Sequence, residues 1–441
     1  MNFEEGRGKQ KNNMSRNQSF FNVVLLAAVL LCLFFSAQPR ATTVRDQIVV
    51  ADKTESVALH VPPTVLRNAS LCRRKPRPSH FTLNSEMPPL VQLQRGMKPK
   101  YYSTGYYGWK FQRYVPSAFE SEWLEEMKKR ETNESVEVVI ESTATRMKER
   151  FEKLLTILSK YATKRVFPHR HTLLDQCNDP ANDTCGWVPD DLDEDVMSRF
   201  DYKYGCWDGP CDGQEPQEPN GKERRGFIEP LVGHLRHPGF TTKKDDNYMP
   251  HRDFLIVDKW SMQNVGRPPE PCDGTRSAVF DLGASAFLPA FYSSQWYLDV
   301  IASCLCTPMT DYYGWEAKRH AIPFLHVPGS LYPKYRFYNF PITAIEDSWK
   351  NPLNTLLSEH HEQDTIMFKL DIDAPLIEEA VVKLILEVPE VSRLIDEFFF
   401  EHHVNMGRMV KSWGPSDTPP SVSIKVFQDL RYLGIRAHSW I

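Results

Sequence analysis

The sequence predicts an α/β fold: a parallel sheet at the C-terminus, preceded by a helical and loop-rich region and by an N-terminal transmembrane helix. Three observations lead to this prediction. Strand-like and helix-like runs alternate over 275–441, as they do in parallel α/β sheets. Residues 20–37 contain no charged side chain, and prolines concentrate in 38–100. We therefore expect an anchor, a stem, an accessory region at 101–274 and one α/β domain.

Composition argues against two broad classes of protein. The 441 residues contain 53 Lys and Arg against 57 Asp and Glu, which gives a formal net charge of −4. A protein that holds nucleic acid through bulk charge normally carries a clear basic excess, so we expect no nucleic-acid partner. Hydrophobic residues make up 41% of the chain, enough for a buried core, which argues against a wholly disordered protein.

The uncharged run at 20–37 is long enough to cross a thin bilayer, because a helix of this length spans roughly 27 Å. A cleaved signal peptide is the alternative, but a 19-residue segment precedes the run and no good small-x-small cleavage pair follows it. Basic residues flank both sides, so the positive-inside bias is weak. We expect a single-pass type II protein with residues 1–19 in the cytosol and its body in the lumen of the endoplasmic reticulum or Golgi.

Cysteine usage favours such a lumenal body. Eight cysteines follow the apolar run, and four of them lie in a loop-like stretch, as disulfides in an oxidising compartment do. A zinc site is the alternative, although the spacing matches no regular ligand pattern. Its ligands would be Cys206, Cys211, His234 and His237. The sequons at Asn68, Asn133 and Asn182 permit glycosylation without arguing for it.

The stem at 38–100 holds eight prolines and little hydrophobic periodicity, which indicates an extended segment. In the accessory region, Ser117-Ala-Phe-Glu120 fits a capping box that opens a helix. A second pattern repeats at spacings of four and three residues and predicts another helix, packed on its own domain or forming a short dimerising coil. We expect loops over 172–275. The apolar helix positions are Phe119, Trp123 and Met127, and then Met147, Phe151, Leu154, Leu158 and Tyr161.

The alternating runs over 275–441 define six candidate strands and three candidate helices, about the content of one ordinary domain. The strands are expected at 278–283, 311–316, 335–340, 365–373, 395–403 and 435–439. The helices are expected at 291–304, 376–386 and 422–433. Polar side chains follow several of these strands. Since the carboxyl ends of parallel strands meet at one edge of a sheet, that edge is where we look for a site.

The first strand ends in Asp281-Leu-Gly283-Ala284, an apolar strand running into a glycine turn. Such a turn begins many nucleotide-binding sheets, because glycine allows the backbone to turn tightly beside a ligand. Glu316 follows the second strand about 35 residues later, where a carboxylate can accept hydrogen bonds from ribose hydroxyls. The glycine turn alone is equally compatible with a purely structural role, but together the two features indicate a nucleoside-binding edge.

Two further groups of polar residues follow later strands. Met367-Phe-Lys369-Leu-Asp371-Ile-Asp373 ends one strand, and alternation places its lysine and both aspartates on the same face. Glu401-His402-His403 ends the next strand, after a run of phenylalanines. Two acids at a strand end rarely serve packing, so we expect a functional role at this edge.

In this order, D-L-G-A-S, Y-G-W-E-A, F-K-L-D-I-D-A-P-x-I-E and D-E-F-F-F-E-H-H resemble the FkbM-type family of S-adenosylmethionine-dependent methyltransferases. The resemblance covers roughly 275–441. It implies a Rossmann-like methyltransferase sheet, S-adenosylmethionine as cofactor, no metal, and transfer to oxygen of a sugar or another small acceptor. It also implies residue roles. Asp281, Gly283 and Ala284 would face the methionine part of the cofactor, Glu316 its ribose, and Asp371, Asp373, Glu401 and His403 the acceptor.

The sequence departs from the family pattern at two places. Ser285-Ala286-Phe287 stands where the family has Asn and a second Gly, and Asp373-Ala374-Pro375 replaces an acid–glycine pair. We expect the bulky Phe287 to crowd the cofactor. A base must remove the acceptor's hydroxyl proton; His403 suits this role by its pKa and Asp371 by its position.

Two rival interpretations remain open. A type II anchor, a stem and a lumenal body also describe Golgi glycosyltransferases, in which Asp371-x-Asp373 would hold Mn²⁺ against a nucleotide-sugar diphosphate. That interpretation gives no role to Asp281 or Glu316. The other rival is a non-catalytic lumenal relative that binds a ligand without transferring a group. The sequence indicates neither the acceptor nor the oligomeric state.

Overall fold

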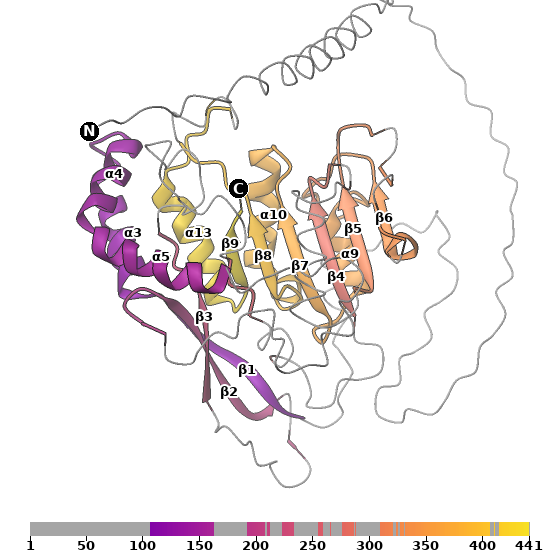
Figure 1. Cartoon of the computed structure of the whole chain (residues 1–441). Helices are drawn as coiled ribbons and strands as arrows, with labels where there is room; N and C mark the ends of the chain where they lie inside the picture. The colour runs from indigo at the N-terminus through magenta and orange to yellow at the C-terminus, as the bar shows by residue number, and fades with distance from the viewer. Residues whose placement is uncertain are drawn as a thin grey trace, which may run out of the picture. The chain divides into compact units, whose positions relative to one another are not determined.

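A six-stranded parallel sheet forms the C-terminal part of the protein, as the alternation of strand-like and helix-like runs predicts. Its strand order is β6-β5-β4-β7-β8-β9, and every neighbouring pair is parallel (Figure 1). The strands are β4 (Ser277–Leu282), β5 (Asp311–Trp315), β6 (Tyr335–Tyr338), β7 (Thr365–Leu370), β8 (Glu397–Phe400) and β9 (Arg436–Ser439). The computed structural model describes residues 106–162, 192–207, 210–211, 223–232, 255–258, 265, 276–285, 287, 309–320, 323–324, 327–329, 331–405, 410 and 414–440.

The strand order creates a switch point at the centre of the sheet. The chain runs outward from β4 to β5 and β6, then returns to the other side of β4 and continues from β7 to β9. This is the order of a doubly wound, Rossmann-like sheet. Ligands of such sheets bind outside the carboxyl ends of the strands on either side of the switch point, which here are β4, β5 and β7.

The sequence forms these strands because their apolar residues can be covered on both faces. Every residue of β4, β5, β7 and β8 is buried, as expected for the interior of a parallel sheet. Rings stack across neighbouring strands: Phe280 lies 4.6 Å from Tyr313 and 5.6 Å from Phe368, centroid to centroid. The few charged residues in these strands therefore lie inside an apolar layer, where a charge must be paired.

Helices follow the strands, and most begin with a proline in the first turn, where its missing N–H costs nothing. The expected helices at 376–386 and 422–433 are present as α10 and α13, whereas 291–304 lies outside the described residues. Helices α9 and α11 and the 3₁₀ turn η4 (Tyr332–Lys334) are not among the expected elements. The α-helices are α9 (Pro352–Glu359), α10 (Pro375–Glu387), α11 (Pro389–Ser392) and α13 (Pro420–Tyr432).

The accessory region contains both expected helices and, in addition, a three-stranded antiparallel sheet of order β1-β2-β3. Two of these strands, β2 and β3, lie within 172–275, where the sequence predicts loops. The Ser117 hydroxyl caps the first helix by accepting from Glu120 N at 3.0 Å, as the capping box predicts. The elements are β1 (Tyr106–Val115), α3 (Ala118–Arg130), α4 (Val136–Arg146), α5 (Lys148–Ala162), β2 (Ser198–Trp207) and β3 (Glu223–Ile228).

A buried ionic network joins the accessory region to the last strand and helix of the α/β sheet. His438 contacts Glu229 at 2.6 Å through Nδ1 and Glu397 through Nε2. Arg431 donates to the Tyr114 hydroxyl and to the Glu229 carbonyl, both at 2.9 Å. The side chains of His438 and Arg431 are fully buried, so the two regions share one interior.

Several expectations about the N-terminal half concern residues that the structure does not describe. The anchor at 20–37, the stem at 38–100 and most of the cysteines lie outside the described residues. Among the residues that are described, no helix is long and apolar enough to span a membrane. Cys206 and Cys211 form a disulfide, which leaves neither thiolate for the zinc site that the sequence left open. Asn133 lies exposed in the turn between α3 and α4.

Candidate functional site

The carboxyl ends of β4 and β7 are joined by a buried lysine. Asp281 and Lys369 are opposite each other in the register of these two strands, so their side chains share one face of the sheet. Lys369 Nζ lies 3.1 Å from Asp281 Oδ1 and 3.1 Å from Asp371 Oδ2, and it donates to the Gly283 carbonyl at 3.0 Å. Burial alone would lower the pKa of Lys369, but the carboxylates of Asp281 and Asp371 outweigh it and hold this pKa above its usual value.

The turn after β4 is shaped by the neighbouring strand end. Gly283 has a φ of +84°, and a Cβ added there would lie 1.5 Å from the carbonyl oxygen of Asp371. Only glycine therefore allows this approach of two backbones. The N–H groups of Gly283 and Ala284 both donate to the Trp315 carbonyl, at 2.9 and 3.0 Å. Glycine is therefore needed for the two strand ends to come into contact. The backbone N–H groups of Gly283 and Ala284 are already used within the protein and are not available to a ligand.

The carboxylate of Glu316 connects the ends of β4 and β5. Its Oε2 accepts from Ser285 N at 3.0 Å, and its Oε1 accepts from Lys318 N at 2.7 Å. The residue is half-buried. Each carboxylate oxygen has two lone pairs, so Glu316 can accept further hydrogen bonds from a hydroxyl-bearing ligand.

A second cluster lies at the carboxyl ends of β7 and β8 and consists of Asp373, Glu401 and His403. One ligand atom from each of the three lies within 4.8 Å of the others. His403 Nε2 is 3.3 Å from Glu401 Oε2 and 3.9 Å from Asp373 Oδ1. The side chains are 1% exposed for His403, 14% for Glu401 and 79% for Asp373. The cluster therefore runs from a buried imidazole to an open carboxylate.

Glu378, in the first turn of α10, lies behind this second cluster. Its Oε1 accepts from Ile372 N at 2.8 Å, and the residue is 1% exposed. Burial raises the pKa of Glu378 to about 7, and the carboxylates of Asp371 and Glu401 add to the shift. Burial would lower the pKa of His403, but Glu401, Glu378 and Asp373 together raise it. The pKa of each of these two groups therefore depends on the charges of its neighbours.

The two aspartates of the D-x-D segment belong to different clusters. The Asp371 carboxylate contacts Lys369, whereas Asp373 turns toward His403 with a φ of +54°. Strand β7 ends at Leu370, so the alternation that predicts one common face does not extend to Asp373. Among the described residues, the metal-compatible group contains Asp373 but not Asp371, which counts against a cation held by Asp371-x-Asp373.

All eight residues expected at the site lie at this one edge of the sheet, but in different settings. Asp281 is fully buried, with its Oδ2 2.5 Å from the Tyr312 hydroxyl that donates to it. Ala284 is also buried, whereas Gly283 and Glu316 are partly accessible. Phe287, expected to crowd a cofactor, is buried between the rings of Tyr312 and Tyr335, at 6.1 and 5.8 Å.

Neither Lys369 nor Glu378 is among the residues that the sequence predicts for the site. Lys369 carried a signal, because a lysine inside an otherwise apolar strand needs a buried partner. Glu378 lies five residues after Asp373 at the start of a helix, where acidic residues are common for reasons of the helix dipole alone. Its proximity to His403 depends on the tertiary packing of α10, which no local pattern indicates.

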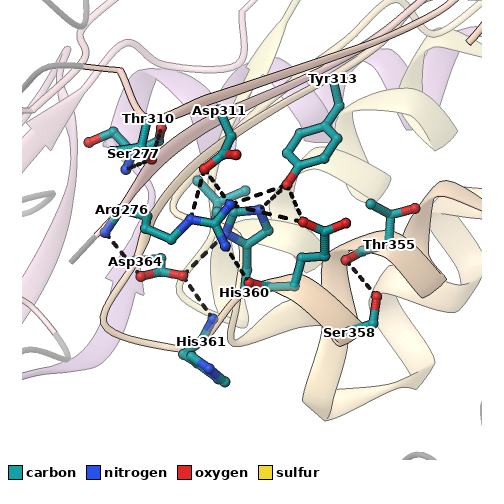
Figure 2. A network of polar contacts seen from close by, with 12 residues as sticks. Arg276, Ser277, Thr310, Asp311, Tyr313, Thr355, Ser358, His360, His361 and Asp364 are labelled. Carbon is teal, nitrogen blue, oxygen red and sulfur yellow. Dashed lines mark hydrogen bonds and ion pairs between the residues drawn. The ribbon is translucent and has the colours of Figure 1, made fainter. Parts of the chain in front are cut away.

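The opposite edge of the sheet also carries a polar cluster (Figure 2), made of Arg276, Asp311, Tyr313, His360 and Asp364. The Asp364 carboxylate accepts from the backbone N–H groups of Arg276 and His361, each at 3.1 Å. His360 lies between Asp364 and the Tyr313 hydroxyl, 3.2 Å from each. Arg276 Nε donates to Asp311 at 2.7 Å. Arg276 and Asp364 directly precede β4 and β7, and Asp311 is the first residue of β5, so the cluster joins the amino ends of these three strands.

The sequence matches no protein-family model, and neither a curated protein nor a solved structure matches it.

Proposed function

We propose that this protein is an S-adenosylmethionine-dependent methyltransferase that acts on an oxygen of a sugar or another small acceptor. The proposal places the cofactor over the ends of β4 and β5 and the acceptor over the ends of β7 and β8. The protein's body would be lumenal and anchored by 20–37. The proposal combines the resemblance carried by the four sequence motifs with the geometry of the carboxyl edge.

The observation that carries the proposal is the excess of carboxylates at this edge. Among the residues that the structure describes, the charged contacts at this edge involve five carboxylates, one lysine and one imidazole. Such an edge attracts a positively charged ligand and disfavours an anionic one. S-adenosylmethionine carries a sulfonium cation and no phosphate, so its charge fits these residues.

The turn after β4 supports a cofactor without a diphosphate. Dinucleotide-binding sheets cradle the pyrophosphate with free backbone amides in a turn that contains several glycines. Here the described turn has one glycine, and the amides of Gly283 and Ala284 are already bonded to Trp315. Glu316, in contrast, retains lone pairs for ribose hydroxyls. The available donors and acceptors therefore match a nucleoside better than a nucleotide.

On the acceptor side, Glu401 and His403 form the pair that would accept the hydroxyl proton. Glu401 is partly exposed and meets the acceptor, while His403 Nε2 lies 3.3 Å behind its Oε2. Asp371 suits this role less, because Lys369 stabilises its ionised form. The bound cofactor supplies the electrophilic methyl group. The protein aligns the acceptor oxygen with it and removes the proton.

The test is ligand-induced thermal stabilisation of the 441-residue chain. A ligand that binds the native state at 100 times its Kd stabilises it by about 2.7 kcal/mol. We expect such a shift with S-adenosylhomocysteine and a weaker one in Glu316→Ala, while Glu387→Ala, on the exposed end of α10, behaves like the parent. Stabilisation by a UDP-sugar with Mn²⁺ and not by S-adenosylhomocysteine would favour the glycosyltransferase instead. No response to either would leave the non-catalytic binding protein.

A further inference from the structure

The cluster of Asp373, Glu401 and His403 has the donors and the spacing of a metal site. Its three ligand atoms come from the ends of two adjacent strands and lie within 4.8 Å of one another. Donors bound to one cation at about 2.1 Å lie roughly 3 Å apart when adjacent. The His403–Glu401 separation of 3.3 Å is close to this value, and the 3.9 Å to Asp373 can close because that side chain is exposed.

A second observation, the buried carboxylate of Glu378, also points to a cation in this cluster. Glu378 is 1% exposed, and its Oε2 has no hydrogen-bond partner among the described residues. Its other oxygen accepts from Ile372 N, next to Asp373, and the carboxylate interacts electrostatically with His403 and Glu401. A buried carboxylate oxygen without a partner is costly, because it has lost its hydration without replacement. A cation in the cluster would offset this cost.

From these observations we propose that Asp373, Glu401 and His403 bind a divalent transition-metal cation, with Glu378 behind them as an outer carboxylate. One imidazole and two carboxylates form a mixed nitrogen and oxygen set, which suits Mn²⁺ better than Mg²⁺ or Ca²⁺. The exposed side of Asp373 leaves coordination positions open to a ligand from solution. Ordinary surface acids do not combine such an opening with an imidazole that is 1% exposed.

A cation here would also refine the methyl-transfer chemistry, in a step that rests on the proposed function. Bound to the acceptor oxygen, it would lower the pKa of that hydroxyl and fix its position. Glu401 and His403 would then act as ligands instead of accepting the hydroxyl proton, which would pass to solvent. The binding of the metal itself does not depend on this role.

The experiment measures Mn²⁺ binding to the chelator-treated 441-residue chain by electron paramagnetic resonance, without cofactor or acceptor. We expect saturable binding at one site, weakened by about tenfold or more in Asp373→Asn and in Glu401→Gln. The matched control is Glu379→Gln, an exposed carboxylate on the same helix as Glu378, which should leave the affinity unchanged. An electron spin echo signal from one bound ¹⁴N nucleus should be present and should disappear in His403→Gln.

Three results would overturn the proposal. The first is the absence of saturable Mn²⁺ binding to the parent chain. The second is binding without a ¹⁴N signal, which would place the ion away from His403. The third is binding that weakens in Asp371→Asn but not in Glu401→Gln, which would locate it at the D-x-D segment. Because S-adenosylhomocysteine binding is measured separately, failure of the metal site is distinguishable from failure of the proposed methyltransferase.

Discussion

The two edges of the parallel sheet carry polar clusters of similar size but opposite character. At the amino edge, Arg276 pairs with Asp311 and His360 bridges Asp364 and Tyr313 (Figure 2). At the carboxyl edge, Asp373 is 79% exposed, and one buried oxygen of Glu378 has no hydrogen-bond partner among the described residues. A cluster whose polar groups bond to one another stabilises a fold, whereas one with an exposed carboxylate and an unpartnered buried oxygen has capacity for a ligand. The difference is consistent with a stabilising role for the amino edge and with the binding role that we propose for the carboxyl edge.

The largest expected effect concerns Lys369, the buried lysine that lies between Asp281 and Asp371. Lys369→Met should lower the free energy of unfolding by about 3–5 kcal/mol, because it removes the buried cation that pairs with the fully buried Asp281 carboxylate. Chemical denaturation measures this value. Lys383→Met is the control, since its side chain is 69% exposed beside Glu387, and it should change stability by less than about 0.5 kcal/mol. Equal effects of the two substitutions would show that the carboxyl edge does not depend on this lysine.

The pH dependence of stability should differ in sign between the edges. The pKa of Glu378 is raised to about 7 in the folded protein, so between about pH 4.5 and 7 the folded state holds a proton that the unfolded state releases. Stability therefore falls as the pH rises through this window. Glu378→Gln should remove this loss and stabilise the protein by up to roughly 3 kcal/mol at pH 8, with little effect at pH 4.5. A stabilisation by Glu378→Gln that does not depend on pH would contradict the raised pKa of Glu378.

At the amino edge, burial alone would raise the pKa of Asp364 and of Asp311. Hydrogen bonds from His360 and two backbone amides nevertheless lower the pKa of Asp364, and pairing with Arg276 lowers the pKa of Asp311. Their stabilisation is complete above the usual value near 3.8 and is lost as the pH falls. Asp364→Asn should lower the free energy of unfolding by about 2 kcal/mol at pH 7 and by less in acid. Ligand binding should not change. A weaker affinity of Asp364→Asn for S-adenosylhomocysteine or Mn²⁺ would contradict the view that the amino edge stabilises the fold without binding a ligand.

The smallest expected effect on stability is that of Asp373→Asn. The side chain is 79% exposed and asparagine tolerates the positive φ of this residue, so denaturation should detect a change below about 0.5 kcal/mol. Methyl transfer, measured with S-adenosylmethionine and a sugar acceptor, should fall by about tenfold or more. Loss of stability without loss of transfer would assign Asp373 to the fold.

The parallel sheet could be predicted from the sequence because its signals are local. All six strands are confirmed within three residues at the amino end of each, and Ser117 caps its helix as expected. Local sequence patterns do not predict the features that tertiary contacts determine. The Glu120 side chain does not return to the Ser117 backbone as a full capping box requires, but accepts from Tyr114 and Gln428 in the interior. The short helix α9, of eight residues, is too brief to show a clear period.

The candidate site could be located by the strand ends, but its groupings could not be predicted. Alternation along one strand places Asp371 and Asp373 together, whereas the structure separates them because the strand ends before both. The pairing of Asp281 with Lys369 requires the strand order, since it joins residues 88 positions apart. The positions of Lys369, between the two aspartates, and of Glu378, behind His403, depend on packing between elements that are distant in the sequence.

The most direct test of the account compares S-adenosylhomocysteine binding to the parent chain, Glu316→Ala and Asp364→Asn by calorimetric titration. Glu316 and Asp364 both accept hydrogen bonds from two backbone amides, but at opposite edges of the sheet. We predict saturable binding to the parent, a loss of about tenfold in Glu316→Ala and an unchanged Kd in Asp364→Asn. No binding to the parent chain, or equal losses in the two variants, would contradict a cofactor site at the carboxyl edge.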